Sequence, residues 1–323
     1  MNSEISEIRL EELDTGEFIK QKTNEISSVV GNGLAVNALS GGVDSSTVTM
    51  LAHRALGNRL KTYFIENGLM RDGEAERVAS FFRKLGVEVK ILDVRKQFFA
   101  ALKGLTDPEE KREAITQTFY RDVFGKLVRE SGAKHLLHGT IYTDVEETVA
   151  GIKRQHNILV QLGIDPEKTY GYKVVEPLVE LRKPAVREVA KALGLPKEIY
   201  ARPPFPGPAL AARVIGEVTP ERVALVRKAT QIVEDELSHM AGFQCLAILH
   251  ADKVTGMREG KRDYGFQIEV RCWDSKDAVT GSPTKIPHET LTSLADRITS
   301  EMPEVVSVTY NITRKPPSTI EAV

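Results

Sequence analysis

"LAVNALSGGVDSSTVTML", residues 34–51, is the stretch that decides the fold. Its first six residues are mostly apolar and of strand length, and the residues from 46 onward have the apolar spacing of a helix. Gly41 and Gly42 lie in the turn between them. A strand, a glycine turn and a helix in this order present backbone N–H groups to a phosphate. The sequence therefore predicts a phosphate site at residues 40–46.

Strand-like and helix-like segments alternate beyond this stretch. Strands are predicted at 60–66, 87–94 and 133–140, and helices at 73–86 and 108–131. The alternation predicts an α/β fold with a doubly wound, mostly parallel sheet that is covered by helices on both faces. In such sheets ligands bind beyond the carboxyl ends of the strands, where the strand order reverses. The glycine turn lies at one such end.

The segment "RPPFPGP" at 202–208 interrupts this alternation, because four prolines in seven residues exclude a helix and a central strand. We predict a boundary here between a domain of residues 1–201 and a smaller α+β domain of residues 202–323. In the smaller domain, helices are predicted at 219–238 and 287–301, and strands at 243–249, 264–273 and 305–313.

The composition is that of an ordinary globular enzyme. The chain has 323 residues, with 44 Lys and Arg against 45 Asp and Glu, so its net charge gives no indication of nucleic-acid or membrane binding. No apolar run approaches the roughly 18 residues of a membrane span, and the acidic start is not a secretion signal. Cys245 and Cys272 are too few for a disulfide framework or a metal cluster and are expected to be buried, inert thiols. We expect a cytoplasmic enzyme.

Known phosphate-binding motifs narrow the identity of the glycine turn. It lacks the G-x-G-x-x-G of dinucleotide-binding proteins and the lysine of the G-x-x-x-x-G-K-[ST] P-loop. An ordinary tight turn between a strand and a helix remains the alternative. The glycines, the serine hydroxyls and the helix N-terminus favour an anion, and Asp44 fits beside phosphates if it holds Mg²⁺. Mg²⁺ without a P-loop lysine indicates cleavage between the α- and β-phosphates of ATP.

"SGGVDSS" at 40–46 resembles the pyrophosphate loop of the N-type ATP pyrophosphatases, which adenylate a carbonyl oxygen and let a nitrogen or sulfur nucleophile displace AMP. Five further blocks, in order along nearly the whole chain, resemble GMP synthetase among these enzymes. They are "IENGLMRDGEAERV" (65–78), "ALKGLTDPEEKR" (101–112), "HGTIYTDVEET" (138–148), "RPPFPGPALAARVIGEVT" (202–219) and "VTYNITRKPPSTIE" (308–321).

This resemblance implies a fold like that of the adenine nucleotide alpha hydrolases, with a C-terminal dimerisation domain. It implies ATP and Mg²⁺ as cofactors, and amidation of xanthosine monophosphate (XMP) to GMP through an adenylyl-XMP intermediate, with release of AMP and pyrophosphate. Ammonia is then free or supplied by a separate glutaminase subunit, and the chain is expected to form a homodimer. Residues 146–173 are expected to form a lid that excludes water from the intermediate.

The resemblance also implies site residues. The loop residues for the phosphates are Ser40, Gly41, Gly42, Asp44, Ser45 and Ser46, and Gly139 joins them at the nucleotide. Asp44, as the Mg²⁺ ligand, and Lys183, facing the phosphates, are the candidate catalytic residues; for Lys183 the alternative is an exposed lysine at a helix start. The candidates for the purine nucleotide are Thr140, Asp144, Arg202, Pro206, Gly207, Lys315, Thr319, Ile320 and Glu321. The alternatives are an acidic helix start at Asp144 and a frayed C-terminus.

Departures from the family pattern lie near the expected acceptor. His138, Gln155 and Ala209 stand where the family has Gln, His and Gly. A paralogue that aminates or thiolates another purine is therefore the alternative function, and an inactive nucleotide-binding module is a further one. Cys245 and Cys272, expected in apolar strands, argue against a self-carried sulfur.

Overall fold

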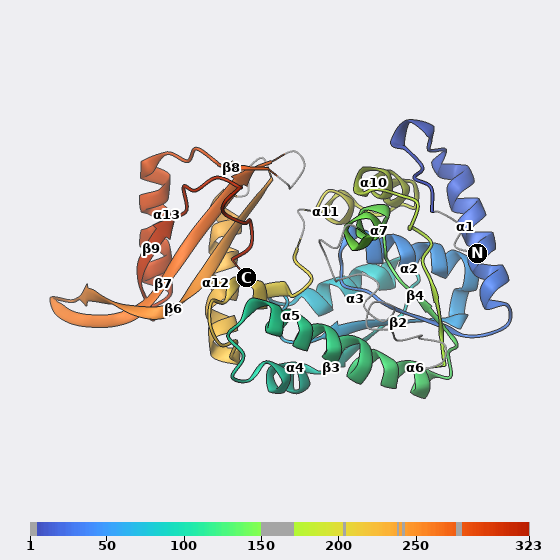
Figure 1. The fold of residues 1–323 in the computed structure, drawn as a ribbon, viewed down its shortest axis with the longest axis horizontal. Coiled ribbons are helices and arrows are strands. Elements are labelled where there is room, and N and C mark those ends of the chain that lie inside the picture. The colour runs from blue at the N-terminus through green and yellow to red at the C-terminus, as the bar shows by residue number, and fades with distance from the viewer. Residues whose placement is uncertain are drawn as a thin grey trace. The chain divides into compact units, whose positions relative to one another are not determined.

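The computed structural model describes residues 5–149, 171–202, 205–237, 239–240, 243–275 and 280–322. By its internal contacts the chain divides into two compact units (Figure 1). Unit 1 comprises Met1–Ile65, Gly73–Asp93 and Tyr120–Arg202. Unit 2 comprises Glu66–Asp72, Val94–Phe119 and Pro203–Val323. Two segments from the first 201 residues therefore belong, by their contacts, with the C-terminal region.

A five-stranded sheet forms the centre of unit 1, in the order β3-β2-β1-β4-β5. Strand β1 (Ala35–Ala38) pairs in parallel with β2 (Leu60–Glu66) and β4 (His135–Leu137), and β4 pairs in parallel with β5 (Lys173–Val175). Strand β3 (Val89–Asp93) is one edge. The strand order reverses between β1 and β4, so the switch point of the sheet lies beside the end of β1. The predicted α/β fold is confirmed.

Helices α1 (Thr15–Val30), α2 (Val43–Leu56) and α10 (Lys183–Ala192) pack against one another in unit 1, and Figure 1 shows them together on one side of the sheet. Their apolar faces are buried, with Ile26 and Leu51 fully enclosed. This packing fixes the start of α2 and the start of α10 relative to the sheet. The other helical segments of the unit, within the described ranges, are η1 (Leu10–Glu12), η2 (Gly57–Arg59), α3 (Glu74–Lys84), α6 (Gly125–Ser131), α7 (Tyr142–Val149) and α11 (Lys197–Tyr200).

The region predicted as one long helix at 108–131 is divided. It consists of α5 (Pro108–Gln117), a π-helical segment (Thr118–Phe124) and α6. Asp107 caps α5 by accepting hydrogen bonds from the first N–H groups of the helix. A π-helical turn inserts an extra residue per turn and is common at functional sites. Helix α4 (Arg95–Leu102), which the sequence patterns did not predict, precedes α5.

Unit 2 is built on a long antiparallel ribbon. Strands β6 (Gln244–Arg258) and β7 (Lys261–Asp274) pair along their length, and β9 (Val305–Tyr310) adds to β7 in parallel. Helices α12 (Pro220–Leu237) and α13 (His288–Glu301) cover this sheet (Figure 1). Among the described residues, unit 2 also contains α4, α5, η4 (Ala209–Arg213) and β8 (Ser282–Pro283). The predicted α+β character of the C-terminal region is confirmed, with β6 and β7 longer and β9 shorter than expected.

The expectation of two separate thiols is wrong. Cys245 and Cys272 lie directly opposite each other on β6 and β7, with Cα atoms 4.1 Å apart, and form a disulfide. They are 27 residues apart in sequence, and the register of the ribbon, which apolar patterning alone does not fix, is what brings them together. Both are buried, at 5% and 1% exposed, so the expectation of burial is confirmed.

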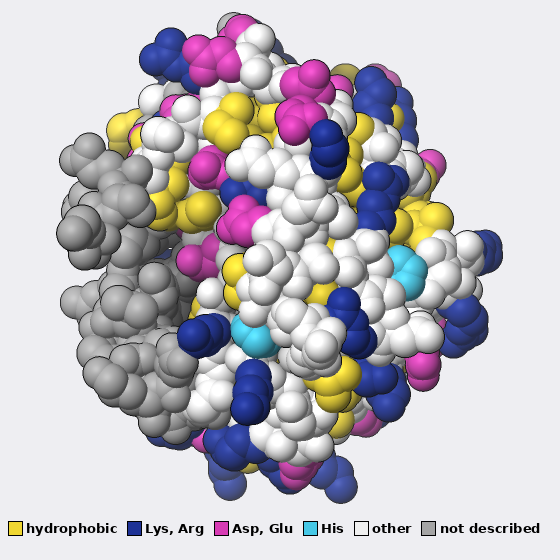
Figure 2. Space-filling model, turned by 90° about the vertical axis from the view of Figure 1, so that its right-hand side faces the viewer, with side chains coloured by type: hydrophobic (Ala, Val, Ile, Leu, Met, Phe, Trp, Pro, Cys, Tyr) yellow, Lys and Arg dark blue, Asp and Glu magenta, His cyan; other side chains and the backbone are white. Residues whose placement is uncertain are grey.

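The surface agrees with the balanced composition. On the face in Figure 2, basic and acidic side chains are interspersed, and neither sign covers the face. None of the helices in the described part of the chain combines the length and apolar character of a membrane span.

Candidate functional site

The turn after β1 leads into a helix whose N-cap residue, Gly42, has no side chain to cap it. Gly42 precedes α2, and its φ of −73° is ordinary for any residue. The first-turn N–H groups of a helix have no intrahelical partner, and the helix dipole adds positive potential at the same end. Placed at the switch point of the sheet, this N-terminus has the geometry of an anion site.

Gly41 occupies a position that requires glycine. Its φ of +79° lies in the left-handed region, and a Cβ would stand 2.7 Å from Cγ2 of Val78. Beside it, the buried carboxylate of Glu74 accepts hydrogen bonds of 2.5 and 2.8 Å from the guanidinium of Arg202. This bidentate pair supports the turn. A role for Arg202 in binding the purine nucleotide stays a prediction.

The three loop serines have different surroundings. The hydroxyls of Ser40 and Ser45 lie 3.0 Å apart, and Ser45 also donates to the carbonyl of Gly42. Ser46 is fully buried, and its hydroxyl has no partner within the described ranges. A buried hydroxyl without a partner costs free energy, and a role for Ser46 in binding the phosphates stays a prediction.

Asp44, in the first turn of α2, and Lys183, the first residue of α10, form an ion pair. The Nζ atom of Lys183 lies 2.5 Å from Oδ2 of Asp44, across 139 positions of sequence. The other carboxylate oxygen of Asp44, Oδ1, is buried and has no partner in the part of the chain that the structure describes. The structure thus brings together the two residues predicted as catalytic and leaves one carboxylate oxygen for a cation.

These donors fit a Mg²⁺ ion that is held mainly by phosphates. The described residues contain no group of three or more His, Cys, Asp or Glu side chains that could hold a metal ion. In nucleotide sites Mg²⁺ takes one or two protein carboxylates and completes its coordination with phosphate oxygens and waters. Oδ1 of Asp44 is a suitable protein ligand of this kind.

Gly139, which follows β4, packs on the start of α2. A Cβ there would stand 3.3 Å from both the Cβ of Asp44 and the backbone nitrogen of Ser45. Any larger residue would therefore push against the first turn of α2. The end of β4 and the phosphate loop are fitted to each other at this contact.

Thr140 and Asp144, which are candidates for contacting the purine nucleotide, make hydrogen bonds to nearby protein groups. Thr140 is 3% exposed, and its hydroxyl is hydrogen-bonded to His138 and to Glu176. The carboxylate of Asp144 accepts the N–H of Ile141 at 3.0 Å, which is the capping contact at the start of α7. The helix-start alternative for Asp144 is therefore realised, and a further role at the purine stays a prediction.

In unit 2, buried arginines hold the C-terminal tail. The guanidinium of Arg213, which has no exposed surface, donates to the carboxylate of Glu321 at 3.1 and 3.2 Å. Arg271 donates to the carbonyl of Thr319 at 2.8 Å and also reaches that of Ile320. Further back, Lys315 exchanges two backbone hydrogen bonds with Gly281. The tail is an anchored segment and not a frayed terminus.

Residues 205–209, near the start of the last segment of unit 2, have an unusual backbone conformation. Ala209 has a φ of +54° and is 1% exposed, so alanine is held in a conformation that favours glycine. Its N–H donates to the carbonyl of Pro206 at 2.9 Å, across Gly207. The ring of Phe205 lies against a guanidinium, with its centroid 5.1 Å from Arg213.

Sequence reasoning missed several supporting residues. Lys111 is 1% exposed, and its Nζ donates to the carbonyls of Val214 and Gly216 at 2.9 Å each. Burial lowers the pKa of Lys111 to about 8. Lys111 stands in the block 101–112, so the block match marked the region without stating what the lysine contacts. Glu74 and Arg271 were also missed, because Arg202 and Thr319, which they contact, are distant from them in sequence.

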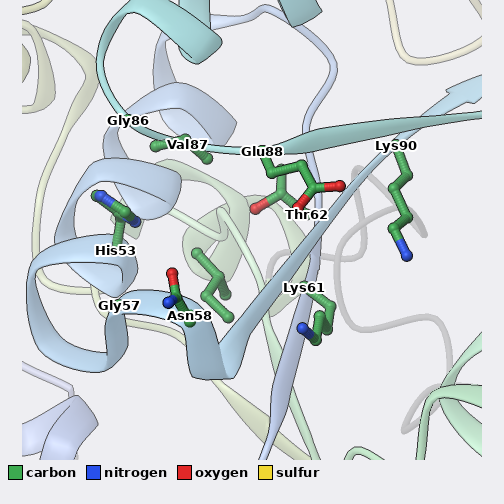
Figure 3. A pocket seen from close by; sticks show the side chains of 10 residues that line it. His53, Gly57, Asn58, Lys61, Thr62, Gly86, Val87, Glu88 and Lys90 are labelled. Carbon is green, nitrogen blue, oxygen red and sulfur yellow. The ribbon is translucent and has the colours of Figure 1, made fainter.

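The predicted lid at 146–173 lies largely outside the described residues, as does Gln155. A cavity of about 350 Å³ elsewhere in unit 1 is shown in Figure 3. It is lined by His53, Asn58, Lys61, Glu88 and Lys90, among others, at the end of α2 and the beginnings of β2 and β3. Since β1 and β2 are parallel, the beginning of β2 lies at the opposite end of the sheet from the phosphate loop, and the cavity is not part of the candidate site.

Comparison with known proteins identifies the family. Residues 231–322 match the GMP synthase C terminal domain, and residues 14–123 match the NAD synthase family. The chain is 48% identical to a subunit of the glutamine-hydrolysing GMP synthase of Archaeoglobus fulgidus, over 96% of this chain and 99% of that protein. The proteins of the same name from Pyrococcus horikoshii and Methanopyrus kandleri are 47% and 44% identical, over 96% and 95% of this chain and 99% of each relative.

The chain belongs to this family of GMP synthase subunits. The resemblance drawn from the sequence blocks is confirmed, and with it the ligase class and the use of ATP. The match of residues 14–123 covers the phosphate loop and the Gly41 turn. The match of residues 231–322 covers the tail that Arg271 and Arg213 anchor.

Proposed function

We propose that the protein catalyses ATP-dependent amidation of XMP to GMP through an adenylyl-XMP intermediate. The observation that carries the proposal is the phosphate loop: it has no P-loop lysine, and it has a buried carboxylate oxygen of Asp44 without a partner among the described residues. Relatives named as GMP synthase subunits, which align over nearly the whole chain, support the choice of acceptor.

In the first half-reaction, the O2 oxygen of XMP attacks the α-phosphorus of ATP, the bond to the β-phosphate breaks, and pyrophosphate leaves. The first-turn N–H groups of α2 and the hydroxyls of Ser40, Ser45 and Ser46 bind the β- and γ-phosphates, with Gly41 and Gly42 permitting close approach. Gly139 fixes this loop from the side of β4. Lys183 turns from Asp44 toward the phosphates as ATP enters.

Asp44 would hold Mg²⁺ through Oδ1, and the ion would neutralise the charge that develops on the departing pyrophosphate. The binding of ATP also offsets a free-energy cost that buried polar atoms carry in the ligand-free protein. Oδ1 of Asp44 and Oγ of Ser46 are buried without partners within the described ranges, and a phosphate with its cation supplies partners for both.

In the second half-reaction, ammonia attacks C2 of the adenylated purine, AMP departs with the former O2 oxygen, and one proton is released. Thr140, Asp144, Arg202, Pro206 and Gly207 are proposed to contact the purine nucleotide, together with the tail residues Lys315, Thr319, Ile320 and Glu321. The tail supports this proposal because Arg213 and Arg271 keep it in a defined conformation.

The proposal extends to partners. The relatives are named as one subunit of a glutamine-hydrolysing enzyme, so we propose a separate glutaminase subunit that supplies ammonia. We also propose a homodimer through the domain of residues 202–323, a cytoplasmic location, and residues 1–201 as the ATP-pyrophosphatase domain. Light scattering at micromolar concentration tests the dimer: a mass of twice 35.8 kDa supports it, and a mass of 35.8 kDa refutes it.

The decisive assay incubates the chain with ATP, Mg²⁺, XMP and ammonium, and follows AMP, pyrophosphate and GMP by chromatography. Equimolar formation of all three supports the proposal. AMP formation only with another purine, or with sulfide in place of ammonium, would identify the altered paralogue. No AMP with any purine nucleotide would leave a nucleotide-binding module.

A further inference from the structure

Four side chains form a continuous hydrogen-bonded chain beside the phosphate loop. The hydroxyl of Tyr120 lies 2.9 Å from Nε2 of His138, and Nδ1 of His138 lies 2.9 Å from Oγ1 of Thr140. The hydroxyl of Thr140 in turn donates to a carboxylate oxygen of Glu176. Three separate segments thus meet at His138: the π-helical turn, the end of β4 and the residues after β5.

The chemistry of the groups fixes the direction of the two bonds at Thr140 and favours one direction for the bond between Tyr120 and His138. A carboxylate only accepts, so the single proton of the Thr140 hydroxyl points to Glu176. The Thr140 oxygen is then an acceptor for His138, which places a proton on Nδ1. Burial raises the pKa of Tyr120, so its hydroxyl stays protonated and can donate to Nε2. All three hydrogen bonds are satisfied together by a neutral imidazole with its proton on Nδ1.

His138 connects this hydrogen-bonded chain to the phosphate loop. The next residue, Gly139, is the one that packs against Cβ of Asp44 and the nitrogen of Ser45. Tyr120 is presented by the π-helical segment, an irregular turn of the kind that proteins keep at functional sites. Rotation of His138 would release the bonds on both sides of it and free the backbone of residues 138–140.

We propose that His138 is a positioning residue, held as the neutral Nδ1–H tautomer between Tyr120 and Thr140, and that it fixes Gly139 against the phosphate loop. The inference rests on the proposed function only in that the loop binds ATP. It also assigns the Thr140 hydroxyl to Glu176 and His138, so that any contact of Thr140 with the purine uses its backbone.

The tautomer is tested on the protein alone. With ¹⁵N-histidine labelling, the signals of His138 are assigned as those lost in His138→Asn, which leaves the six other histidines in place. The proposal expects a pyrrole-type shift for Nδ1 and a pyridine-type shift for Nε2. In Tyr120→Phe the donor to Nε2 is removed, but Thr140 still accepts from Nδ1, so the Nδ1–H tautomer is expected to remain. A pyridine-type Nδ1, or two protonated nitrogens in the unaltered protein, would overturn the proposal.

The positioning role is tested with a matched pair of variants. The amide nitrogen of His138→Asn takes the place of Nδ1 and keeps the hydrogen bond to Thr140. The longer side chain of His138→Gln places its amide near the position of Nε2, toward Tyr120, and loses the hydrogen bond to Thr140. The dissociation constant of a non-hydrolysable ATP analogue with Mg²⁺ is measured by calorimetry. We expect His138→Asn to bind within about two-fold of the unaltered protein and His138→Gln to bind about five-fold more weakly, as for a lost hydrogen bond.

Equal affinities in the two variants would overturn the positioning role. The outcome is separate from that of the proposed function, because the calorimetric measurement contains no purine acceptor. If GMP is not formed but the pair differs as stated, the acceptor is wrong and the role of His138 stands. If the unaltered protein does not bind the ATP analogue, both the proposed function and the positioning role fail, and the labelled spectrum still decides the tautomer.

Discussion

The phosphate loop of unit 1 and the tail of unit 2 each hold an ion pair, but the two pairs differ. In the loop, Asp44 has one oxygen bound to Lys183 and one buried oxygen without a partner in the described residues. In the tail, both oxygens of the Glu321 carboxylate are bound to the fully buried Arg213. In the loop a carboxylate oxygen is left without a partner, whereas in the tail the carboxylate is satisfied by the protein and Nη1 of Arg213 is the atom without a partner among the described residues.

This difference predicts which substitutions should affect activity and which should affect stability. A group left without a partner contributes little to the folded state and gains most when a ligand arrives. A buried ion pair is strongly destabilising to break, because it leaves a charge without compensation. Loop variants should therefore lose turnover and keep their stability, while tail variants should lose stability first.

The largest effect is expected for Asp44→Asn. The amide keeps the shape but removes the negative charge that would hold Mg²⁺, so we expect pyrophosphate release at saturating ATP to fall by about 10³-fold. The melting temperature should stay close to that of the unaltered protein. Asp14→Asn, at the start of α1, is the control for the same substitution outside the site. A loss of less than about ten-fold in Asp44→Asn would contradict the assignment.

The two glycines of the loop offer a sharper test within unit 1. Gly41→Ala combines a φ of +79° with a Cβ only 2.7 Å from Val78, so we expect about 10²-fold loss in kcat/KM for ATP and a destabilisation of about 1–2 kcal/mol. For stability Gly42→Ala is the matched control, because its φ is −73° and its Cβ would lie 3.4 Å from Oγ of Ser40. Equal losses of stability in the two variants would show that the conformation of Gly41 is not what matters.

The tail pair should behave in the opposite way. Glu321→Gln leaves the buried guanidinium of Arg213 without its carboxylate, and we expect a loss of about 3 kcal/mol in the free energy of unfolding. The double variant Arg213→Met with Glu321→Gln should lose less than Glu321→Gln alone, because no buried charge is left unpaired. Urea unfolding measures both. A double variant less stable than Glu321→Gln would contradict a buried pair of this type.

A smaller, pH-dependent effect is expected from Lys111, which is also satisfied within unit 2. Its folded pKa of about 8 lies below the ordinary value of 10.5, so the unfolded chain holds more protons between these values. The stability contributed by this group therefore rises with pH from 8 to 10.5, by up to about 3 kcal/mol. Lys111→Met should lack this rise in urea unfolding across the same pH range. If the free energy of unfolding of Lys111→Met rises with pH as steeply as that of the unaltered protein, another group is responsible for the rise.

Much of unit 1 follows from local patterns. The apolar run at 34–39, the glycine turn and the helix after it predict the β1–α2 connection, and the parallel sheet follows from the alternation of strands and helices. Asp44 stands out because a carboxylate is out of place beside phosphates unless a cation joins it. These are short-range signals, and the chemistry of the loop is contained in seven consecutive residues.

What local patterns do not contain is register and pairing across the chain. The contact between Lys183 and Asp44 spans 139 positions, and nothing near Lys183 distinguishes it from an exposed lysine at a helix start. The disulfide depends on the register of β6 and β7, and the π-helical turn at 118–124 departs from the ordinary helical period. His138 stands out in the sequence as a departure from the family pattern, but its partner Tyr120 belongs to another element.

The central claim is that the loop directs adenylation of a purine carbonyl oxygen. XMP labelled with ¹⁸O at O2, incubated with ATP, Mg²⁺ and ammonium, tests it by mass spectrometry of the products. The account predicts that the label appears in the phosphate of AMP and that the GMP formed carries none. Label in pyrophosphate or inorganic phosphate, or formation of ADP in place of AMP, would contradict it.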